Sequence, residues 1–137
     1  MHKPETTYPF ELEFTVRDYE CDLQGIVNNA VYLNYLEHTR HTFLLSKKID
    51  FAQLHIEGID LVISRIEIDY RRSLTSGDHF VVRLNIVRDG LLKIIFNQEI
   101  TKLPENTLVA RAKVIGVGLK RGRPIRMEDI PGYNGLF

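Results

Sequence analysis

The stretch that decides the fold is CDLQGIVNNAVYLNYLEHTR, residues 21–40. It begins with a carboxylate, Asp22, and a glycine, Gly25, and it runs through two adjacent amides, Asn28 and Asn29, into a segment with helical spacing of apolar residues. Asparagine is among the preferred residues for capping a helix, because its side-chain oxygen accepts a hydrogen bond from an unpaired amide of the first turn. The sequence therefore predicts a polar loop followed by a helix that starts at about Asn29.

Apolar residues recur at intervals of three and four along this helix, which is the spacing of one buried face. They are Tyr32, Leu33, Leu36, Phe43 and Leu44. The polar residues Asn34, His38 and Lys48 fall largely elsewhere. The pattern indicates an amphipathic helix of roughly four turns.

Alternation of apolar and polar residues predicts strands on both sides of the helix. One strand precedes it, and four follow it in antiparallel succession, separated by turns rich in glycine, proline and asparagine. The predicted strands lie around residues 10–16, 65–71, 80–86, 92–100 and 108–114. The expected architecture is a single α+β domain over residues 1–137, with one long central helix packed on a curved antiparallel sheet of about five strands.

The end of the chain contains glycines and prolines that limit regular structure. Gly116 and Gly118 in the last strand are expected to mark a bulge or a close approach to another backbone. The tail from Lys120 to Phe137 contains Pro124 and Pro131 and is expected to cross the surface irregularly.

Composition excludes several classes of protein. The 137 residues include 18 Lys and Arg against 18 Asp and Glu, so no net positive charge draws the chain to nucleic acid. No segment approaches the roughly 20 apolar residues that span a bilayer. The N-terminal stretch MHKPETTYPFELEF lacks the basic head and apolar run of a secretory signal. We therefore expect a cytoplasmic protein with no nucleic-acid or membrane partner.

The sequence offers a weak case for cysteine or metal chemistry. Cys21 is the sole cysteine, and a lone cysteine is more often a small buried residue than a nucleophile. His38 and His41 lie three positions apart on the predicted helix, but no third ligand accompanies them, and a zinc site needs three or four. We expect no metal and no cofactor.

The quoted stretch and the order of elements resemble the hotdog fold, and within it the 4-hydroxybenzoyl-CoA thioesterase-like acyl-CoA thioesterases. The family pattern is an Asp, two residues, then Gly-Ile/Val-Val, then a helix bearing Tyr-x-x-Tyr/Phe-x-Glu. In this chain the pattern is formed by Asp22, Gly25, Ile26, Val27, Tyr32, Tyr35 and Glu37, with Arg40 one turn on. The pair Asn28 and Asn29 looks more like the plant-type and acyl-carrier-protein thioesterases.

The resemblance implies hydrolysis of an acyl-CoA thioester to a free acid and CoA. In this hypothesis Asp22 is the nucleophile or the general base, and the backbone amide of Asn29 at the helix N-terminus stabilises the oxyanion. Gly25 permits a close approach or a positive φ angle, and Asn28 orients water or substrate. Two alternatives stay open: the carrier is acyl carrier protein (ACP), or the protein binds acyl thioesters without turnover.

Plainer interpretations of the same residues also stand. Asp22 is a residue type that binds its own backbone two positions on, and the asparagines are suited to capping alone. Glu37 and Arg40 lie three positions apart on the helix, where an ion pair that supports the loop is possible.

The expected substrate contacts are Tyr32, Ile63, Arg71 and Arg72. Arginine suits the phosphates of a carrier, but Arg88, Lys93 and the Lys120-Arg121-x-Arg123 run are further candidates, and the sequence does not choose among them. The resemblance implies a homodimer with a continuous sheet, or a homotetramer, with active sites between subunits. It also implies that the second subunit supplies residues around 59–64 to the acyl pocket.

Overall fold

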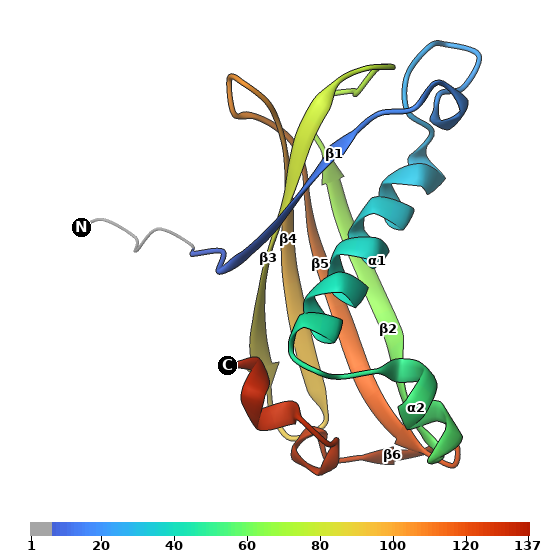
Figure 1. The fold of residues 1–137 in the computed structure, drawn as a ribbon, viewed down its shortest axis with the longest axis vertical. Helices are drawn as coiled ribbons and strands as arrows, with labels where there is room; N and C mark the ends of the chain where they lie inside the picture. The colour runs from blue at the N-terminus through green and yellow to red at the C-terminus, as the bar shows by residue number, and fades with distance from the viewer. Residues whose placement is uncertain (1–6) are drawn as a thin grey trace.

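The computed structural model describes residues 7–137, which form one antiparallel sheet with a long helix lying across it (Figure 1). The strands are β1 (Phe10–Thr15), β2 (Ile59–Tyr70), β3 (His79–Asp89), β4 (Lys93–Lys102), β5 (Thr107–Lys120) and β6 (Arg123–Ile125). The helices are α1 (Asn29–Ser46) and α2 (Phe51–Ile56). This arrangement confirms the predicted α+β class. The predicted extent of the domain, 1–137, includes residues 1–6, which lie outside the described part of the chain.

The order of strands in the sheet is β1-β3-β4-β5-β2, so β1 and β2 form its two edges. The short β6 pairs with the last residues of β5, the same residues that pair with the start of β2 on their other side. All the pairs are antiparallel. The strand β2 therefore offers a free edge of twelve residues.

The core lies between α1 and the face of the sheet that it covers. Apolar side chains of the three central strands point toward the helix and are almost completely buried. They include Phe80, Val82, Leu84, Ile94, Phe96, Ile100 and Val114. Burial of large apolar side chains, at about 1.5–3 kcal/mol each, is the main source of stability for such a two-layer fold.

The helix differs in extent and in burial from its prediction. It has 18 residues, about five turns rather than four. Leu33 is 38% exposed, whereas Tyr35 and Arg40 are buried. The other four predicted residues, Tyr32, Leu36, Phe43 and Leu44, are buried as expected. The buried face is therefore wider on one side than predicted, where Tyr35 rather than Leu33 packs against Phe14 and Phe80.

Two further elements, α2 and β6, were not predicted, and one predicted strand is longer than expected. The helix α2 is only six residues long and is capped by Asp50, whose carboxylate accepts hydrogen bonds from the amides of Ala52 and Gln53. The strand β2 starts at Ile59, six residues before the predicted strand. The expected irregular tail contains β6, which makes a sixth strand. The predicted close approach to another backbone at Gly118 is wrong in its partner, since an added Cβ would lie 2.8 Å from the side chain of Ile130 and the space is filled by side chains.

Within residues 7–137 no helix has the length and hydropathy needed to cross a bilayer.

Candidate active site

The loop between β1 and α1 is folded on itself by backbone hydrogen bonds. The amide of Gly25 donates to the carbonyl of Asp22 at 3.0 Å, and the amide of Asp22 donates to the carbonyl of Ile26 at 2.9 Å. The amide of Asn28 donates to the carbonyl of Glu20 at 3.2 Å, which holds the loop against the start of α1. Gly25 has a φ of +79°, so its predicted positive φ is confirmed, and a side chain there would strain the turn.

The carboxylate of Asp22 is half-buried within this loop. Its Oδ1 accepts a hydrogen bond from the amide of Gln24 at 2.9 Å, which is the predicted bond to its own backbone two residues on. With its amide nitrogen turned toward Asp22, the Gln24 side chain also donates to both carboxylate oxygens, at 3.1 and 3.2 Å. The neighbouring Leu23 is fully exposed. The carboxylate is thus fixed beside an apolar side chain that nothing in the described chain covers.

The N-terminus of α1 lies directly after this loop. Asn28 is the N-cap, and its side-chain oxygen accepts a hydrogen bond from the amide of Ala30 at 2.9 Å. The amide of Asn29 donates to no acceptor among the residues that the structure describes. An unpaired amide at a helix N-terminus points outward and carries part of the positive end of the helix dipole. Asn29 therefore offers a free donor to an anionic oxygen.

The segment between β2 and β3, residues 71–78, lies beside the loop. The amide of Val27 donates to the carbonyl of Leu74 at 2.9 Å, and Ile26 pairs with Thr75. Tyr32 is only 3% exposed, and its hydroxyl accepts a hydrogen bond from the amide of Leu74 at 3.1 Å. In this chain Tyr32 therefore joins α1 to the neighbouring segment, and its contact with substrate stays a prediction.

These bonds bring the two predicted arginines to the same end of the molecule as the loop. Arg71 and Arg72 follow β2 directly, and both backbone amides donate to the carbonyl of Val109. Both side chains are exposed, and neither forms an ion pair with a described residue. Their charges are thus unpaired at that end of the molecule.

The turn before β3 is held by Asp78. Partial burial alone would raise the pKa of Asp78, but hydrogen bonds from the amide and hydroxyl of Thr75 and the charge of Lys102 outweigh it and hold that pKa below its ordinary value. Ser76 also donates to a carboxylate oxygen of Asp18, in the loop that precedes the candidate site. The charged form of Asp78 therefore supports the loop indirectly.

Within one chain Ile63 lies far from Asp22. It lies on the free edge of β2, seven residues before Tyr70 and therefore about 23 Å along the strand from the end that meets the loop. It lines a cavity of about 230 Å³ together with Glu37, Arg40 and Phe96. A role for Ile63 near Asp22 requires a second copy of the chain.

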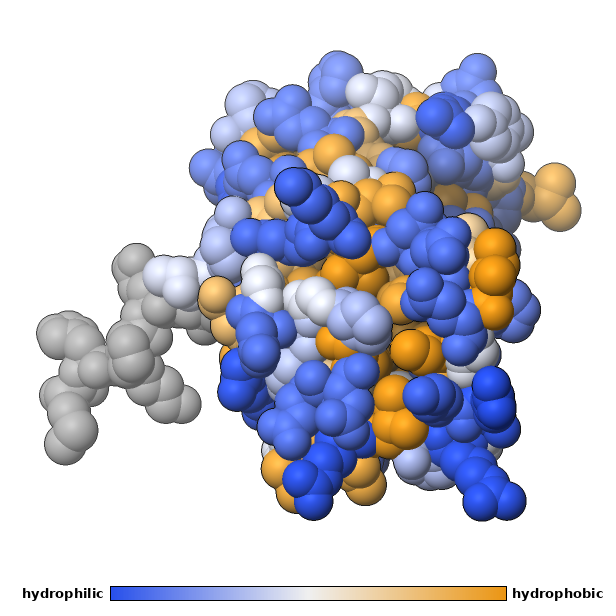
Figure 2. All heavy atoms as spheres, turned by 60° about the horizontal axis from the view of Figure 1, so that its bottom comes forward, coloured by the Kyte–Doolittle hydropathy of each residue, from blue (hydrophilic) through white to orange (hydrophobic). Residues whose placement is uncertain are grey.

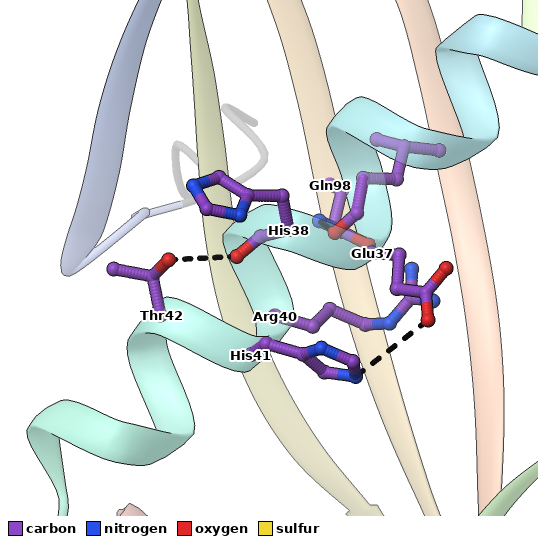
Figure 3. A network of polar contacts seen from close by, with 7 residues as sticks. Glu37, His38, Arg40, His41, Thr42 and Gln98 are labelled. Carbon is purple, nitrogen blue, oxygen red and sulfur yellow. Dashed lines mark hydrogen bonds and ion pairs between the residues drawn. The ribbon is translucent and has the colours of Figure 1, made fainter.

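The predicted ion pair between Glu37 and Arg40 is absent from the structure (Figure 3). Arg40 passes under the helix, and its guanidinium donates to Oε1 of Gln98 at 2.9 Å, while Nε2 of Gln98 donates to the carbonyl of Leu36. Burial lowers the pKa of Arg40, although the charge of Glu37 opposes this shift. Glu37 instead lies 3.8 Å from Nε2 of His41. Arg40 thus joins α1 to β4 inside the core.

The remaining candidates from the sequence are Cys21, His38 and His41, and the structure does not bring them together in a reactive cluster. Cys21 is half-buried and pairs through its backbone with Val27. His38 is exposed and packs against Phe14, and His41 is exposed near Phe51. Among residues 7–137 no group of three His, Cys, Asp or Glu side chains is placed to hold a metal ion.

One buried polar group was not singled out from the sequence. The hydroxyl of Tyr35 is buried and has no hydrogen-bond partner among the described residues. Burial raises the pKa of Tyr35 above its ordinary value, and the nearby carboxylate of Glu20 adds to the shift. The pattern of apolar residues could have placed Tyr35 in the core. It could not have predicted that the hydroxyl of Tyr35 lacks a hydrogen-bond partner.

The chain matches a known protein family over most of its length. The profile of the thioesterase-like superfamily matches residues 16–131. A chloroplastic acyl-acyl carrier protein thioesterase of Arabidopsis thaliana is 42% identical over 120 residues, which cover 87% of this chain and 63% of the plant protein. The long-chain acyl-CoA thioesterase FadM of Escherichia coli is 29% identical over 120 residues, 86% of this chain and 90% of that protein.

Solved structures agree on the fold. The crystal structure of a 1,4-dihydroxy-2-naphthoyl-CoA thioesterase from Synechocystis superposes with a TM-score of 0.82 at 21% identity, covering 86% of this chain and 88% of the other. The chain spans less than two thirds of the length of the plant relative. The match over residues 16–131 nevertheless includes the loop, α1 and every strand after it. The chain belongs to the thioesterase-like superfamily and has the hotdog fold of that family.

Proposed function

We propose that this chain hydrolyses acyl thioesters and that their carrier is ACP, with CoA as the second candidate. The plant relative at 42% identity is named for acyl-ACP, and the more distant bacterial relative at 29% for long-chain acyl-CoA. The sequence alone favoured CoA as the carrier, with ACP as the alternative, and the comparison with these relatives reverses that order. The cytoplasmic location stays a prediction, and the plant relative is described as chloroplastic.

The observation that supports the reaction most is the free amide of Asn29 next to the loop of Asp22. In the first turn of α1 the amide of Ala30 donates to the side chain of the N-cap Asn28. The amide of Asn29 has no acceptor among the described residues. Thioester hydrolysis places negative charge on the carbonyl oxygen in the transition state, and a fixed amide at that position stabilises this charge. The half-buried carboxylate of Asp22 supplies the complementary base.

In the first version of the mechanism Asp22 acts through water. The carboxylate takes a proton from the water while the water oxygen forms a bond to the thioester carbon, and the Asn29 amide binds the resulting oxyanion. The tetrahedral intermediate then breaks its carbon–sulfur bond. The thiolate leaves and receives the proton from Asp22, which gives a free acid and a thiol.

In the second version Asp22 attacks the thioester carbon directly. The thiolate leaves, a mixed anhydride joins Asp22 to the acyl group, and water then hydrolyses it. A single turnover in oxygen-18 water tests the second version. Label in the Asp22 carboxylate identifies an anhydride that water opens at the Asp22 carbon, whereas an unlabelled carboxylate is expected for direct attack by water and for an anhydride opened at the acyl carbon.

We further propose a homodimer, as the sequence analysis expected. The free edge of β2 carries Val62, Ile63, Ile66 and Tyr70, each 37–46% exposed. A long apolar edge strand in water is an aggregation hazard unless another strand covers it. Pairing of β2 with its own copy would remove this hazard and bring the partner's residues 59–64 toward the Asp22 loop.

The test is thiol release from acyl-ACP and acyl-CoA that carry the same acyl group, over short, long and aromatic acyl groups. We expect a higher kcat/KM with ACP, and loss of turnover in Asp22→Asn. Asp89→Asn, at an exposed strand end remote from the loop, is the matched control. Binding without turnover in the wild type would overturn the proposed reaction and favour the acyl-thioester-binding alternative.

A further inference from the structure

One side chain, that of Tyr32, ties the first turn of α1 to the segment before β3. Its hydroxyl accepts a hydrogen bond from the amide of Leu74 at 3.1 Å. The carbonyl of Leu74 accepts in turn from the amide of Val27 at 2.9 Å. Val27 lies two residues before Asn29, and Tyr32 lies three residues after it. The two hydrogen bonds therefore close a ring with the backbone of residues 27–32, and the backbone of Asn29 is part of this ring.

The place of the Tyr32 hydroxyl is fixed by the packing of its aromatic ring. Tyr32 is buried, and its ring meets those of Tyr70 and Tyr35 edge to face, with centres 5.4 and 6.2 Å away. Leu74, which donates to this hydroxyl, is completely buried. A buried amide that loses its acceptor has no water to replace it. The hydroxyl of Tyr32 therefore decides whether the amide of Leu74 is satisfied.

The other contacts that hold the residues before the helix join backbone groups. The amide of Asn28 donates to the carbonyl of Glu20 at 3.2 Å, and Ile26 pairs with Thr75. Substitution of a side chain leaves such backbone bonds in place. Together with the cap residue Asn28, Tyr32 is thus the side chain whose hydrogen bond ties down the start of α1 in the described chain.

The exact position of the Asn29 amide matters for the proposed chemistry. A donor stabilises developing charge when it lies about 2.7–3.1 Å from the oxyanion, and a displacement of about 1 Å can cost a factor of about 100 in rate. The carbonyl oxygen of the bound substrate carries less charge than the oxyanion, so its binding depends less on this donor. A shift of the helix start would therefore lower kcat and leave KM nearly unchanged.

We propose that Tyr32 is a positioning residue for the reaction: through Leu74 and Val27, its hydroxyl holds the amide of Asn29 where the oxyanion forms. This inference rests on the proposed function. Tyr32 acts through the ring of bonds and undergoes no chemical change, so the role requires no contact between its side chain and the substrate.

The chain offers two controls for the variant Tyr32→Phe. Tyr35→Phe removes the same atom one turn further along α1, where the buried hydroxyl has no partner among the described residues. Ile86→Val controls for stability, because it removes one methyl group from a side chain that packs against the core near the end of β3. This strand ends at the lower end of Figure 1, opposite the loop; Figure 2 brings that end forward and shows hydrophilic side chains over much of it. The second control thus lies far from the ring of bonds.

The first test is the steady-state hydrolysis of acyl-ACP by the wild type and the three variants. We expect Tyr32→Phe to lower kcat about tenfold or more and to keep KM within about twofold, because the displaced amide serves the oxyanion rather than the bound substrate. Tyr35→Phe and Ile86→Val are expected to keep kcat and KM within about twofold of the wild type. A kcat of Tyr32→Phe equal to that of Ile86→Val would assign Tyr32 to stability alone and overturn the inference.

Amide hydrogen exchange, read by NMR, tests the ring of bonds without turnover. Loss of the Tyr32 hydroxyl should speed up exchange at Leu74, which loses its acceptor, and at Val27, whose acceptor is the carbonyl of the same residue. We expect exchange at both amides to be about tenfold faster or more in Tyr32→Phe than in Ile86→Val. Unchanged exchange at Val27 would show that the effect of the hydroxyl ends at Leu74, and it would overturn the inference whatever the activity.

The two tests together identify which proposal fails. Faster exchange at Val27 with an unchanged kcat overturns the role of Tyr32 and leaves the proposed function intact. Binding of acyl-ACP by the wild type without any hydrolysis overturns the proposed function, and the role of Tyr32 in the reaction falls with it. Faster exchange at Val27 together with a lower kcat and an unchanged KM in Tyr32→Phe alone is the result that the inference predicts.

Discussion

The side-chain oxygen of Asn28 accepts a hydrogen bond from the amide of Ala30 at 2.9 Å, across the first residue of α1. This bond satisfies one of the orphan donors at the helix start and leaves the amide of Asn29 without a partner among the described residues. The cap thus leaves the amide of Asn29 as the free donor that we propose for the oxyanion. Stability and the proposed chemistry depend on the same side chain.

We predict that Asn28→Ala destabilises the protein by about 1 kcal/mol, because Ala cannot accept the Ala30 amide. The Ala30 amide would then compete with Asn29 for the oxyanion, so kcat should also fall. Asn28→Asp keeps an acceptor at this position and should retain the stability. Thermal unfolding and steady-state hydrolysis of the two variants check this, and equal stability of wild type and Asn28→Ala would contradict it.

Two tyrosines one turn apart on α1 should respond in opposite directions to loss of their hydroxyls. In Tyr32→Phe the buried amide of Leu74 loses its acceptor, and we expect a loss of about 1–3 kcal/mol. In Tyr35→Phe a buried hydroxyl without a partner is removed, and we expect the stability to stay equal or to rise by about 1 kcal/mol.

Chemical denaturation of the two tyrosine variants measures this contrast directly, because each differs from the wild type by one oxygen atom. A loss of stability in Tyr35→Phe as large as that in Tyr32→Phe would mean that Tyr35 is hydrogen-bonded in solution, with Glu20 as the nearest candidate.

Asp78 should make a pH-dependent contribution to stability. Its pKa is lower in the folded chain than in the unfolded chain, so its contribution is complete above the unfolded value of about 3.9 and is lost as the pH falls through the folded value. We predict that Asp78→Asn is less stable than the wild type at pH 7 and at pH 5. The difference should shrink below about pH 4. A difference that does not change between pH 7 and pH 3 would show that the charge of Asp78 plays no part.

The proposed pairing of β2 with its own copy can be tested by cross-linking. The bulge between Ile63 and Arg65 lets inward-facing residues match when the two-fold axis lies between Ser64 and Arg65, which places Ile63 of one copy opposite Ile66 of the other. In a Cys21→Ser background, Ile63→Cys/Ile66→Cys should form a covalent dimer on oxidation, because each new cysteine lies opposite its counterpart in the partner, within disulfide reach. Each single cysteine variant lacks an opposite thiol and should stay uncross-linked. Non-reducing electrophoresis reads the result. Efficient cross-linking of Ile63→Cys alone would place the two-fold axis elsewhere.

The sequence predicted the features that depend on neighbours along the chain. Alternation of apolar residues located the strands, Asn28 marked the start of α1, and Gly25 has the expected positive φ. Asp22 makes the predicted bond to the amide two residues on. Each of these features is decided within a few residues, so it is visible in a local pattern.

The features that the sequence missed depend on distant residues. The helical spacing allowed an ion pair between Arg40 and Glu37, but the partner of Arg40 is Gln98, 58 positions away. The bond from Leu74 to Tyr32 spans 42 positions. The helix α2 is too short for its period to show.

The central claim is that Asp22 performs thioester hydrolysis beside the free amide of Asn29. The most direct measurement is the single-turnover rate of acyl-ACP hydrolysis by the wild type and by Asp22→Asn, at enzyme concentrations that saturate binding, with the fold of both checked by thermal unfolding. We predict that Asp22→Asn lowers this rate by a factor of about 100 or more, while acyl-ACP binding is kept. A rate in Asp22→Asn within about twofold of the wild-type rate would contradict the claim and move the search for the catalytic group elsewhere in the chain.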